Sequence, residues 1–225
     1  MEYINESVLT NISKEMNIKT EQIIAVLEML KDEKTVAFIA RYRKEATGGL
    51  DEEAIRQIEE HYNYGVNLEK RKQDVIRLIE EKGMLSDELK NQILASTKLI
   101  EVEDLYRPYK EKKKTKATEA IALGLEPLAD IMMKLWQKGD KNEIASRFLT
   151  DKVTTVEEAI MHARYIVAER ISDNAEYRGY IRDAAMRYGT IICKKKNNDL
   201  DQEEKYKNYY DSKECVGRIK PHRVL

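Results

Sequence analysis

The sequence predicts an all-α protein, and three features lead to that prediction. Of the 225 residues, 36% are charged, above the roughly 25% of an average globular domain. Only 9 glycines and 3 prolines interrupt the chain, as expected when long, solvated helices dominate. Apolar residues recur at intervals of three and four, which is the spacing of a buried helix face. We therefore expect a multi-helix domain with a short extended segment near the C-terminus.

Net charge and cysteine usage narrow the classes of function. Lys and Arg total 40 and Asp and Glu total 41, so the chain has no overall attraction to nucleic acid or to an anionic membrane. Cys193 and Cys215 lie far apart, and no charged-then-apolar leader precedes Glu2. No apolar run approaches the roughly 20 residues of a membrane span. We expect a soluble, cytoplasmic protein that contains no disulfide and needs no metal or cofactor.

The first expected elements form a helix pair. Thr20 precedes an apolar run over 23–30 that has helical spacing. Thr35 can cap a second helix over 36–46, which Gly48 ends by tolerating a left-handed conformation. Because the connection between the two helices is short, the pair resembles a helix-turn-helix.

A much longer helix is expected from Asp51 to Gly83. Apolar residues continue along it, but Gly65, Glu69 and Lys72 break the heptad seam, so a sustained coiled coil is not expected. A projecting helix with a solvated middle and two packed ends accounts for the interrupted apolar face.

Shorter helices follow, each marked by start or stop signals. Ser86 can cap one helix, the apolar run over 99–105 stops before Pro108, and the run over 117–123 ends at Gly124. Three pairs have the spacing of a capping box, in which each side chain satisfies a backbone donor of the other end. These pairs are Asp140 with Glu143, Thr154 with Glu157, and Asp173 with Glu176.

Helical order is expected to end at Gly189. The β-branched residues that follow favour extended structure, and 194–198 form a polar turn. We expect Cys193 to be a small packed hydrophobe in the extended run. The chain is therefore divided into a helical domain, 1–189, and an extended segment with a linker, 190–225.

Several stretches resemble the Tex family of transcription accessory proteins. Residues 38–51, FIARYRKEATGGLD, resemble the signature near the start of that family. Residues 102–117, VEDLYRPYKEKKKTKA, followed by 124–129, GLEPLA, resemble its central N-terminal motif. With AERIS at 168–172 and PHR at 221–223, the resemblance spans almost the whole chain.

The resemblance implies a particular domain organisation. Members of the family have a helical N-terminal region with a helix-turn-helix, then an RNase H-like domain, helix-hairpin-helix repeats and an OB-fold RNA-binding domain. The last three are not found in this sequence, so we expect the chain to be the N-terminal part of a longer protein. Tyr206, Tyr209 and Tyr210 are then expected to anchor a short helix and to form a docking surface for the RNase H-like domain.

A basic segment is the first candidate for a nucleic-acid site. Cations neutralise phosphates and aromatic rings stack on bases, and Tyr106 and Tyr109 interleave with the cations here. The cations are Arg107, Lys110, Lys112, Lys113, Lys114 and Lys116. A charge run after a proline is also commonly a solvated loop, and both interpretations stay open.

Arg41 and Lys44 form the second candidate. Helical spacing of about 100° per residue places them on one side of the helix, with Phe38 and Tyr42 on the apolar side. A recognition helix would direct them to phosphates or base edges. Alternatively, they are surface ion-pair partners, and Arg43 is a packed, paired guanidinium.

Motifs for catalysis are not found. His61, His162 and His222 are isolated in the sequence, without an HxxxH or HExxH arrangement for a metal. No phosphate-binding glycine loop or nucleophile elbow occurs, and Cys215 lacks a recognisable base. We therefore expect no enzymatic activity.

Two functions are consistent with these observations. The first is a non-catalytic N-terminal scaffold of a nucleic-acid-binding transcription accessory protein, which positions downstream RNA-binding domains and contacts RNA or DNA through the basic segment. The alternative is a protein-interaction module that docks on the transcription machinery through the long helix, where Glu52, Glu53, Glu59 and Glu60 favour a protein partner. A membrane partner is not expected, and the sequence does not specify an oligomeric state.

Overall fold

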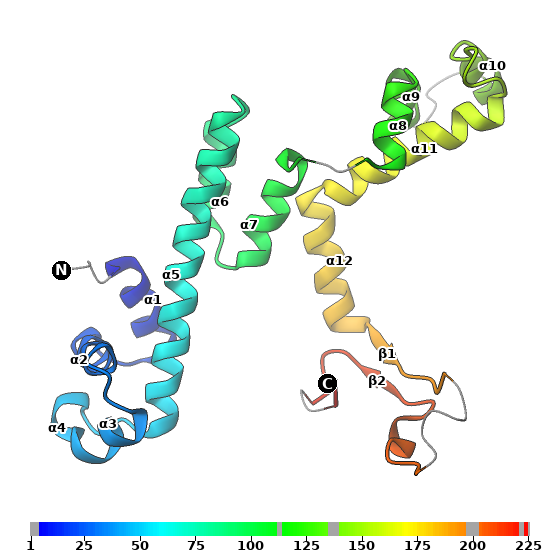
Figure 1. The fold of residues 1–225 in the computed structure, drawn as a ribbon. Coiled ribbons are helices and arrows are strands. Elements are labelled where there is room, and N and C mark those ends of the chain that lie inside the picture. Colours follow the sequence, from blue (N-terminus) through cyan, green and yellow to red (C-terminus); the bar gives the residue numbers. More distant parts are fainter. Residues whose placement is uncertain (1–4, 112–113, 135–139, 197–202, 221–222, 225) are drawn as a thin grey trace. The chain divides into compact units, whose positions relative to one another are not determined.

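The computed structural model describes residues 5–111, 114–134, 140–196, 203–220 and 223–224. The chain forms two compact units, Met1–Glu103 and Asp104–Leu225, which meet within one helix. Helices make up nearly all regular structure of the described residues in both units (Figure 1). The predicted class is confirmed: the protein is all-α, with a short extended segment near its C-terminus.

The first unit is built around one long helix (Figure 1). Its helices are α1 (Glu6–Met16), α2 (Thr20–Lys31), α3 (Val36–Tyr42), α4 (Lys44–Thr47), α5 (Glu52–Glu81), α6 (Asp87–Ala95) and the first part of α7 (Leu99–Tyr106). Helices α1, α2 and α3 pack against α5, and α6 contacts α5 farther along. The main core of the unit contains Val8, Leu9, Ile12, Ile23, Val26, Met29, Ile39, Ile55 and Ile58.

Helix α1 was not predicted. Asn5 caps it, because its side-chain oxygen accepts the backbone N–H groups of Ser7 at 3.1 Å and Val8 at 3.3 Å. Val8 and Ile12, four residues apart, are buried on one face. An N-cap residue followed by this apolar spacing is the signal that predicts the helix.

The expected single helix over 36–46 is two helices. Thr35 caps α3 as predicted, and Gly48 is left-handed with φ 68°. The chain leaves helical geometry at Arg43, where φ is -127° and ψ is 29°. The break is fixed by α2, since the amide of Gln22 donates to the carbonyl oxygen of the buried Thr47 at 2.7 Å.

Helix α5 begins and ends close to the predicted residues, and Asp51 caps it by accepting the N–H of Ala54 at 2.8 Å. Between Ile58 and Leu68 it carries no buried side chain, as expected for a solvated middle. One side of that middle is nevertheless in contact with α1. A Cβ added to Gly65 would lie 2.5 Å from Cγ1 of Val8. The glycine that interrupts the apolar seam therefore allows α1 to approach the α5 backbone.

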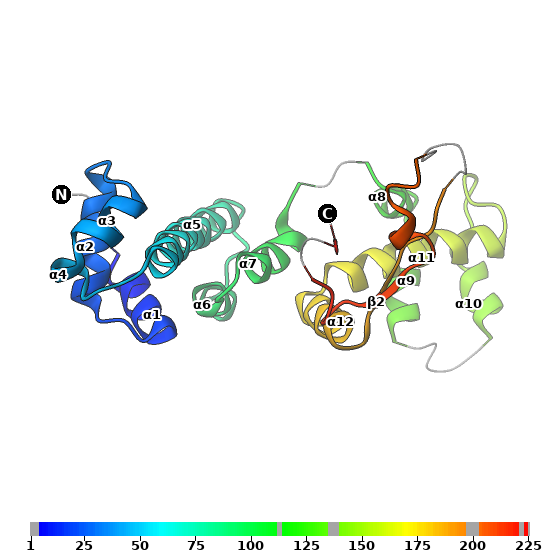
Figure 2. The ribbon, with the colours of Figure 1, turned by 90° about the horizontal axis from the view of Figure 1, so that it is seen from below.

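The second unit has a separate core. Its elements are the end of α7, η1 (Arg107–Tyr109), α8 (Lys116–Ala122), α9 (Glu126–Met133), α10 (Lys141–Ser146), α11 (Val156–Asp173), α12 (Ala175–Tyr188), β1 (Thr190–Ile192), η2 (Lys207–Tyr209) and β2 (Lys213–Cys215). Helix α11 packs against α8 and α9 (Figure 2). Small residues at the contact, including Ala117, Ala120 and Ala163, are buried and permit close helix packing.

At two of the three predicted capping boxes the cap lies one residue later than expected, and no reciprocal box is formed at any of the three described helix starts. Asp140 caps α10 as expected. Helix α11 is capped by Thr155, and Glu158 accepts the N–H of Thr154 at 3.2 Å, so the predicted box starting at Thr154 is wrong. Hydrogen bonds from the backbone N–H groups at this helix start lower the pKa of Glu158. Helix α12 is capped by Asn174 rather than by the residue before it.

The displacement at α12 has a structural cause. Asp173 is buried, and its carboxylate accepts from Nε of Arg107 at 2.8 Å, so it is not available as a cap. A second buried acid, Asp104, accepts from both Arg178 and Arg182 of α12. These ion pairs hold α12 to the end of α7. Removing one partner of such a buried pair would leave an uncompensated charge.

The extended segment is a two-stranded hairpin. Strands β1 and β2 are antiparallel, and Thr190 pairs with Cys215. The extended run begins where it was predicted, but Cys193 is exposed, so its expected role as a packed hydrophobe is wrong. The 3-10 helix η2 lies at the short helix expected around Tyr209. Both strands belong to the same compact unit as α8 to α12, and the domain boundary at 189 stays a prediction.

The contact at Gly65 generates the first testable prediction. Gly65→Ala forces Val8 away from α5, at a cost of about 1–3 kcal/mol that exceeds the gain in helix propensity of about 1 kcal/mol. Faster amide hydrogen exchange in α1 measures the effect. In a Val8→Ala background, Gly65→Ala should no longer lower the stability relative to Val8→Ala alone, because the clashing methyl groups are gone. Gly179→Ala in α12 is the matched control, since a Cβ there meets nothing within 4 Å and should stabilise the helix. A Gly65→Ala protein as stable as the control would contradict the close contact.

Candidate functional site

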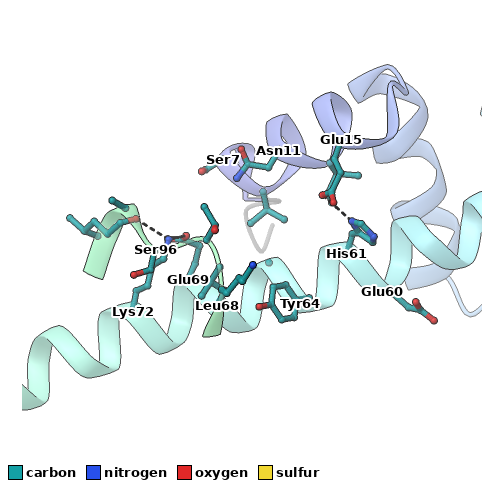
Figure 3. A pocket seen from close by; sticks show the side chains of 17 residues that line it. Ser7, Asn11, Glu15, Glu60, His61, Tyr64, Leu68, Glu69, Lys72 and Ser96 are labelled. Carbon is teal, nitrogen blue, oxygen red and sulfur yellow. Dashed lines mark hydrogen bonds and ion pairs between the residues drawn. The ribbon is translucent and has the colours of Figure 1, made fainter. Parts of the chain in front are cut away.

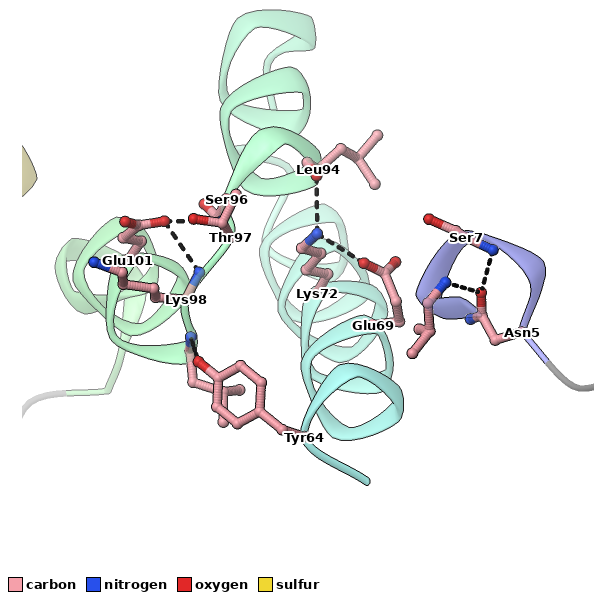
Figure 4. Close-up of polar contacts among 12 residues, drawn as sticks. Asn5, Ser7, Tyr64, Glu69, Lys72, Leu94, Ser96, Thr97, Lys98 and Glu101 are labelled. Atoms are coloured by element: carbon pink, nitrogen blue, oxygen red, sulfur yellow. Dashed lines mark hydrogen bonds and ion pairs between the residues drawn. The ribbon is translucent and has the colours of Figure 1, made fainter. Parts of the chain in front are cut away.

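A groove follows one side of α5 in the first unit (Figure 3). Helix α5 forms its floor, α1 forms one wall, and the end of α6 with the connection to α7 forms the other (Figure 4). Its volume is about 920 Å³, within the range of protein binding sites. The lining extends along α5 from Glu60 to Lys72, which is roughly 18 Å at the rise of an α-helix.

The bottom of the groove is apolar. Val8 and Ile12 of α1 and Leu68 of α5 line it, and all three side chains are buried. Tyr64 of α5 and Leu94 of α6 are 44% and 40% exposed. The groove therefore offers apolar surface to solvent above a packed base.

Lys72 fixes one wall (Figure 4). It is only 5% exposed, and its ammonium donates to Glu69 at 2.8 Å and to the carbonyl oxygen of Leu94 at 2.9 Å. That carbonyl lies in the last turn of α6, where carbonyl groups lack helical partners and a cation is favoured. Lys72 therefore breaks the apolar seam of α5 in order to hold the end of α6.

The start of α7 is also held in place. The hydroxyl of Tyr64 accepts the N–H of Leu99 at 3.0 Å. Glu101 accepts the backbone N–H groups of Thr97 at 2.9 Å and Lys98 at 3.1 Å. Backbone donors at this helix start are consequently satisfied within the chain, which leaves the side chains of the wall as its exposed polar groups.

Four polar side chains on the two walls form no hydrogen bond with any residue that the structure describes. They are Ser7 and Asn11 on α1, and Thr97 and Lys98 on the facing wall. Together they present a carboxamide, two hydroxyl groups and an ammonium to the groove. These groups are available to a bound molecule.

One end of the groove is acidic. Nδ1 of His61 lies 3.2 Å from Oε2 of Glu15, and Glu60, whose side chain points away from that pair, lines the same end (Figure 3). Farther along, Glu69 and Lys72 neutralise each other as an ion pair. The end near Glu60 therefore holds two carboxylates, and that of Glu15 lies against His61.

The predicted basic segment lies in the second unit, and several of its cations have partners there. Arg107 pairs with Asp173 at 2.8 Å, and the ammonium of Lys114 lies 3.3 Å from Glu119. Lys110 also lies 5.2 Å from the centre of the Tyr106 ring, and Lys116 lies 5.0 Å from that of the Tyr165 ring. Lys112 and Lys113 lie outside the described residues. Lys114 remains 82% exposed, so its ion pair leaves the charge open to solvent.

Arg41 and Lys44 lie on different helices, α3 and α4, but line the same shallow hollow of about 280 Å³. Asp51 and Glu52 line it too, and their carboxylates weaken attraction to phosphate. The structure thus brings the two cations together next to acids. Their role in nucleic-acid binding, and the helix-turn-helix itself, stay predictions.

The expected apolar side of α3 is only partly buried. Ile39 is fully buried, whereas Phe38 is 36% exposed and Tyr42 is 65% exposed. The two rings lie 5.3 Å apart. Arg43 is exposed rather than packed, as one of the two alternatives had it. Its guanidinium lies 5.5 Å from the centre of the Phe38 ring, which is a cation–π contact.

Groups that could bind a metal are dispersed. Among the described residues, no three or more His, Cys, Asp and Glu side chains gather into a possible metal site. His162 lies beside Tyr165 with ring centres 6.0 Å apart, and His222 lies outside the described residues.

Helix α12 presents an apolar stripe to solvent in the second unit. Tyr177, Ile181 and Tyr188 recur at helical spacing and are 47%, 63% and 80% exposed. Arg178 and Arg182, which bind Asp104, lie on another side of the helix. None of the residues of α12 is buried. A helix of this pattern commonly packs its stripe against another element.

The groove was not predicted as a site. Two signals could have indicated it: a glycine and a lysine at Gly65 and Lys72, both within the apolar seam of a long helix. The sequence shows these as interruptions only. Their partners, Val8 and Leu94, lie far away along the chain, so their contacts require the tertiary structure.

Comparison with known proteins gives two matches to family models. The Tex-like protein N-terminal domain matches residues 6–80, and the Tex central region-like model matches residues 136–225. Across the described residues, no helix is long and apolar enough to cross a membrane.

Curated relatives match almost the whole chain. An uncharacterised protein of Bacillus subtilis is 46% identical over 95% of this chain and 30% of its own length. The transcriptional accessory protein Tex of Neisseria gonorrhoeae is 41% identical over 95% of this chain and 28% of its own length. A human S1 RNA-binding domain-containing protein is 25% identical over 99% of this chain and 23% of its own length. The chain thus spans less than a third of these relatives, and it belongs to the Tex family, whose N-terminal and central regions it matches.

Proposed function

We propose that this chain is a non-catalytic helical scaffold of a transcription accessory protein that binds nucleic acid. It supports the parts of a family member that lie beyond the matched stretch. Relatives named as a transcriptional accessory protein and as an S1 RNA-binding domain-containing protein support the assignment to transcription and RNA. Both are more than three times as long as the stretch that they share with this chain, as their coverage of 28% and 23% implies.

The exposed stripe of α12 carries the scaffold proposal. A helix in a monomeric protein normally buries its apolar face, whereas the side chains of Tyr177, Ile181 and Tyr188 are exposed to solvent. The ion pairs of Arg178 and Arg182 fix the helix from another side. Helix α12 is therefore held in place while its stripe remains available. In a longer family member, the segment after the matched stretch covers it.

Hydrogen exchange tests the scaffold proposal. In a chimaera, this chain is followed by the part of the Bacillus subtilis relative beyond the matched stretch. Amides of α12 should exchange at least tenfold more slowly in the chimaera than in the chain alone, because docking covers the stripe. Ile181→Ser should reverse much of this protection, while α2 serves as the internal control. Equal exchange of α12 in both proteins would contradict the proposal.

The basic segment is the proposed nucleic-acid contact within this chain. The solvent-exposed Lys114 and the neighbouring lysines concentrate positive charge, and the half-buried Tyr109 provides a ring close to it, whereas Tyr106 is buried. Arg107 is bound to Asp173, so it contributes mainly by positioning the start of the segment.

Anisotropy with a labelled single-stranded RNA tests this contact across a salt series. Replacing Lys112, Lys113 and Lys114 by Ala should weaken binding. The slope of the logarithm of the binding constant against the logarithm of the salt concentration should become shallower by about 2, since each phosphate contact contributes about 0.7. The control replaces the second lysine run, Lys194 to Lys196, by Ala, with the same change in charge. If both variants lose the same RNA affinity, the loss results from net charge alone, and the proposal that this segment is a specific contact is rejected.

A second candidate function is favoured by the groove along α5: docking of a protein partner on the long helix. Glu15 and Glu60 at one end disfavour a polyanion, and apolar surface with open hydrogen-bonding groups is typical of protein recognition. The two functions use different units and are compatible with each other.

A further inference from the structure

We infer that the groove along α5 binds an extended peptide segment of a protein partner, with a basic side chain at the end near Glu15 and Glu60. The inference rests on the second candidate function above, a protein partner on the long helix, and is independent of the scaffold proposal. The floor of roughly 18 Å accommodates about five residues of extended chain at about 3.3 Å per residue.

The walls favour an extended segment over a helix. Each residue of an extended chain has a backbone N–H and a C=O that require partners, whereas a helix satisfies these groups internally. The carboxamide of Asn11 offers one donor group and one acceptor, which can bind a peptide unit from the side. The hydroxyl groups of Ser7 and Thr97 provide further contacts from opposite walls (Figure 4).

The middle of the groove suits an apolar side chain. Tyr64 and Leu94 present exposed apolar surface, and the buried Leu68 lies on the floor. The hydroxyl of Tyr64 is bound to the N–H of Leu99, which holds the side chain in one position across the groove. The lining is consequently preorganised, which lowers the entropic cost of binding.

Charge determines the class of partner and its direction. The carboxylates of Glu15 and Glu60 attract a Lys or Arg side chain to this end of the groove. Lys98 on the facing wall suits an acidic side chain or a peptide carbonyl. The same two carboxylates repel the phosphates of a nucleic acid, which makes RNA the disfavoured occupant.

Selection from a random dodecapeptide library displayed on phage, with the whole chain as bait, provides the probe. The enriched sequences should share a Lys or Arg separated by a few residues from an apolar residue. A fluorescein-labelled consensus peptide then gives the dissociation constant by anisotropy. Glu60→Lys should weaken binding at least tenfold and Asn11→Ala at least threefold. Glu80→Lys, an exposed residue of the same helix outside the groove, is the matched control and should leave binding unchanged.

Other outcomes overturn the inference in distinguishable ways. Absence of an enriched peptide, or a peptide unaffected by Glu60→Lys, rejects the groove as its site. If such a peptide is instead lost in a Glu52→Lys, Glu53→Lys variant, a partner still docks on α5 and the second candidate function survives. If no α5 variant weakens binding of the peptide, both the groove inference and the second candidate function are rejected. If oligouridylate displaces the labelled peptide, and displaces it more strongly from the Glu60→Lys variant, the groove is instead assigned to single-stranded nucleic acid. Circular dichroism of every variant checks that the helices remain folded.

Discussion

Helix α5 keeps two other helices at a fixed separation, and the rest of the first unit depends on that constraint. Gly65 allows Val8 of α1 to reach the helix backbone, and Lys72 donates to the carbonyl oxygen of Leu94 in the last turn of α6. Each contact lies at a position where an apolar side chain would complete the seam of α5. Because the seam is interrupted at both positions, the two neighbouring helices stand apart as walls, and the groove lies between them.

Both units use buried ions to position helices. Lys72 is buried with Glu69 and a helix-terminal carbonyl, and Asp104 is buried with Arg178 and Arg182. A buried charge is costly unless its hydrogen bonds are complete, so such contacts specify geometry more than they add stability. In the second unit the outcome is a helix, α12, that is held from one side and exposes an apolar stripe on another. Each unit therefore presents one surface suited to a partner.

Local signals predicted most helices, and tertiary contacts explain the remainder. Thr35, Asp51 and Ser86 cap helices where the sequence indicated, because capping depends on residues three positions away. The cap of α12 was misplaced since Asp173 is used by Arg107, 66 positions distant in sequence. The basic segment could be located from the sequence, but its partners could not. The groove was missed because neighbours along the chain do not reveal that Gly65 faces Val8.

The central claim is that Lys72 fixes the wall of the groove, and a distance across the groove tests it most directly. Spin labels at Lys14→Cys on α1 and Gln92→Cys on α6, in a Cys193→Ser, Cys215→Ser background, report that distance by pulsed electron paramagnetic resonance. We expect one narrow distribution with Lys72 present and a broad one in Lys72→Met, which retains the length of the side chain but not the ammonium that binds Glu69 and Leu94. The same narrow distribution in both proteins would contradict the claim.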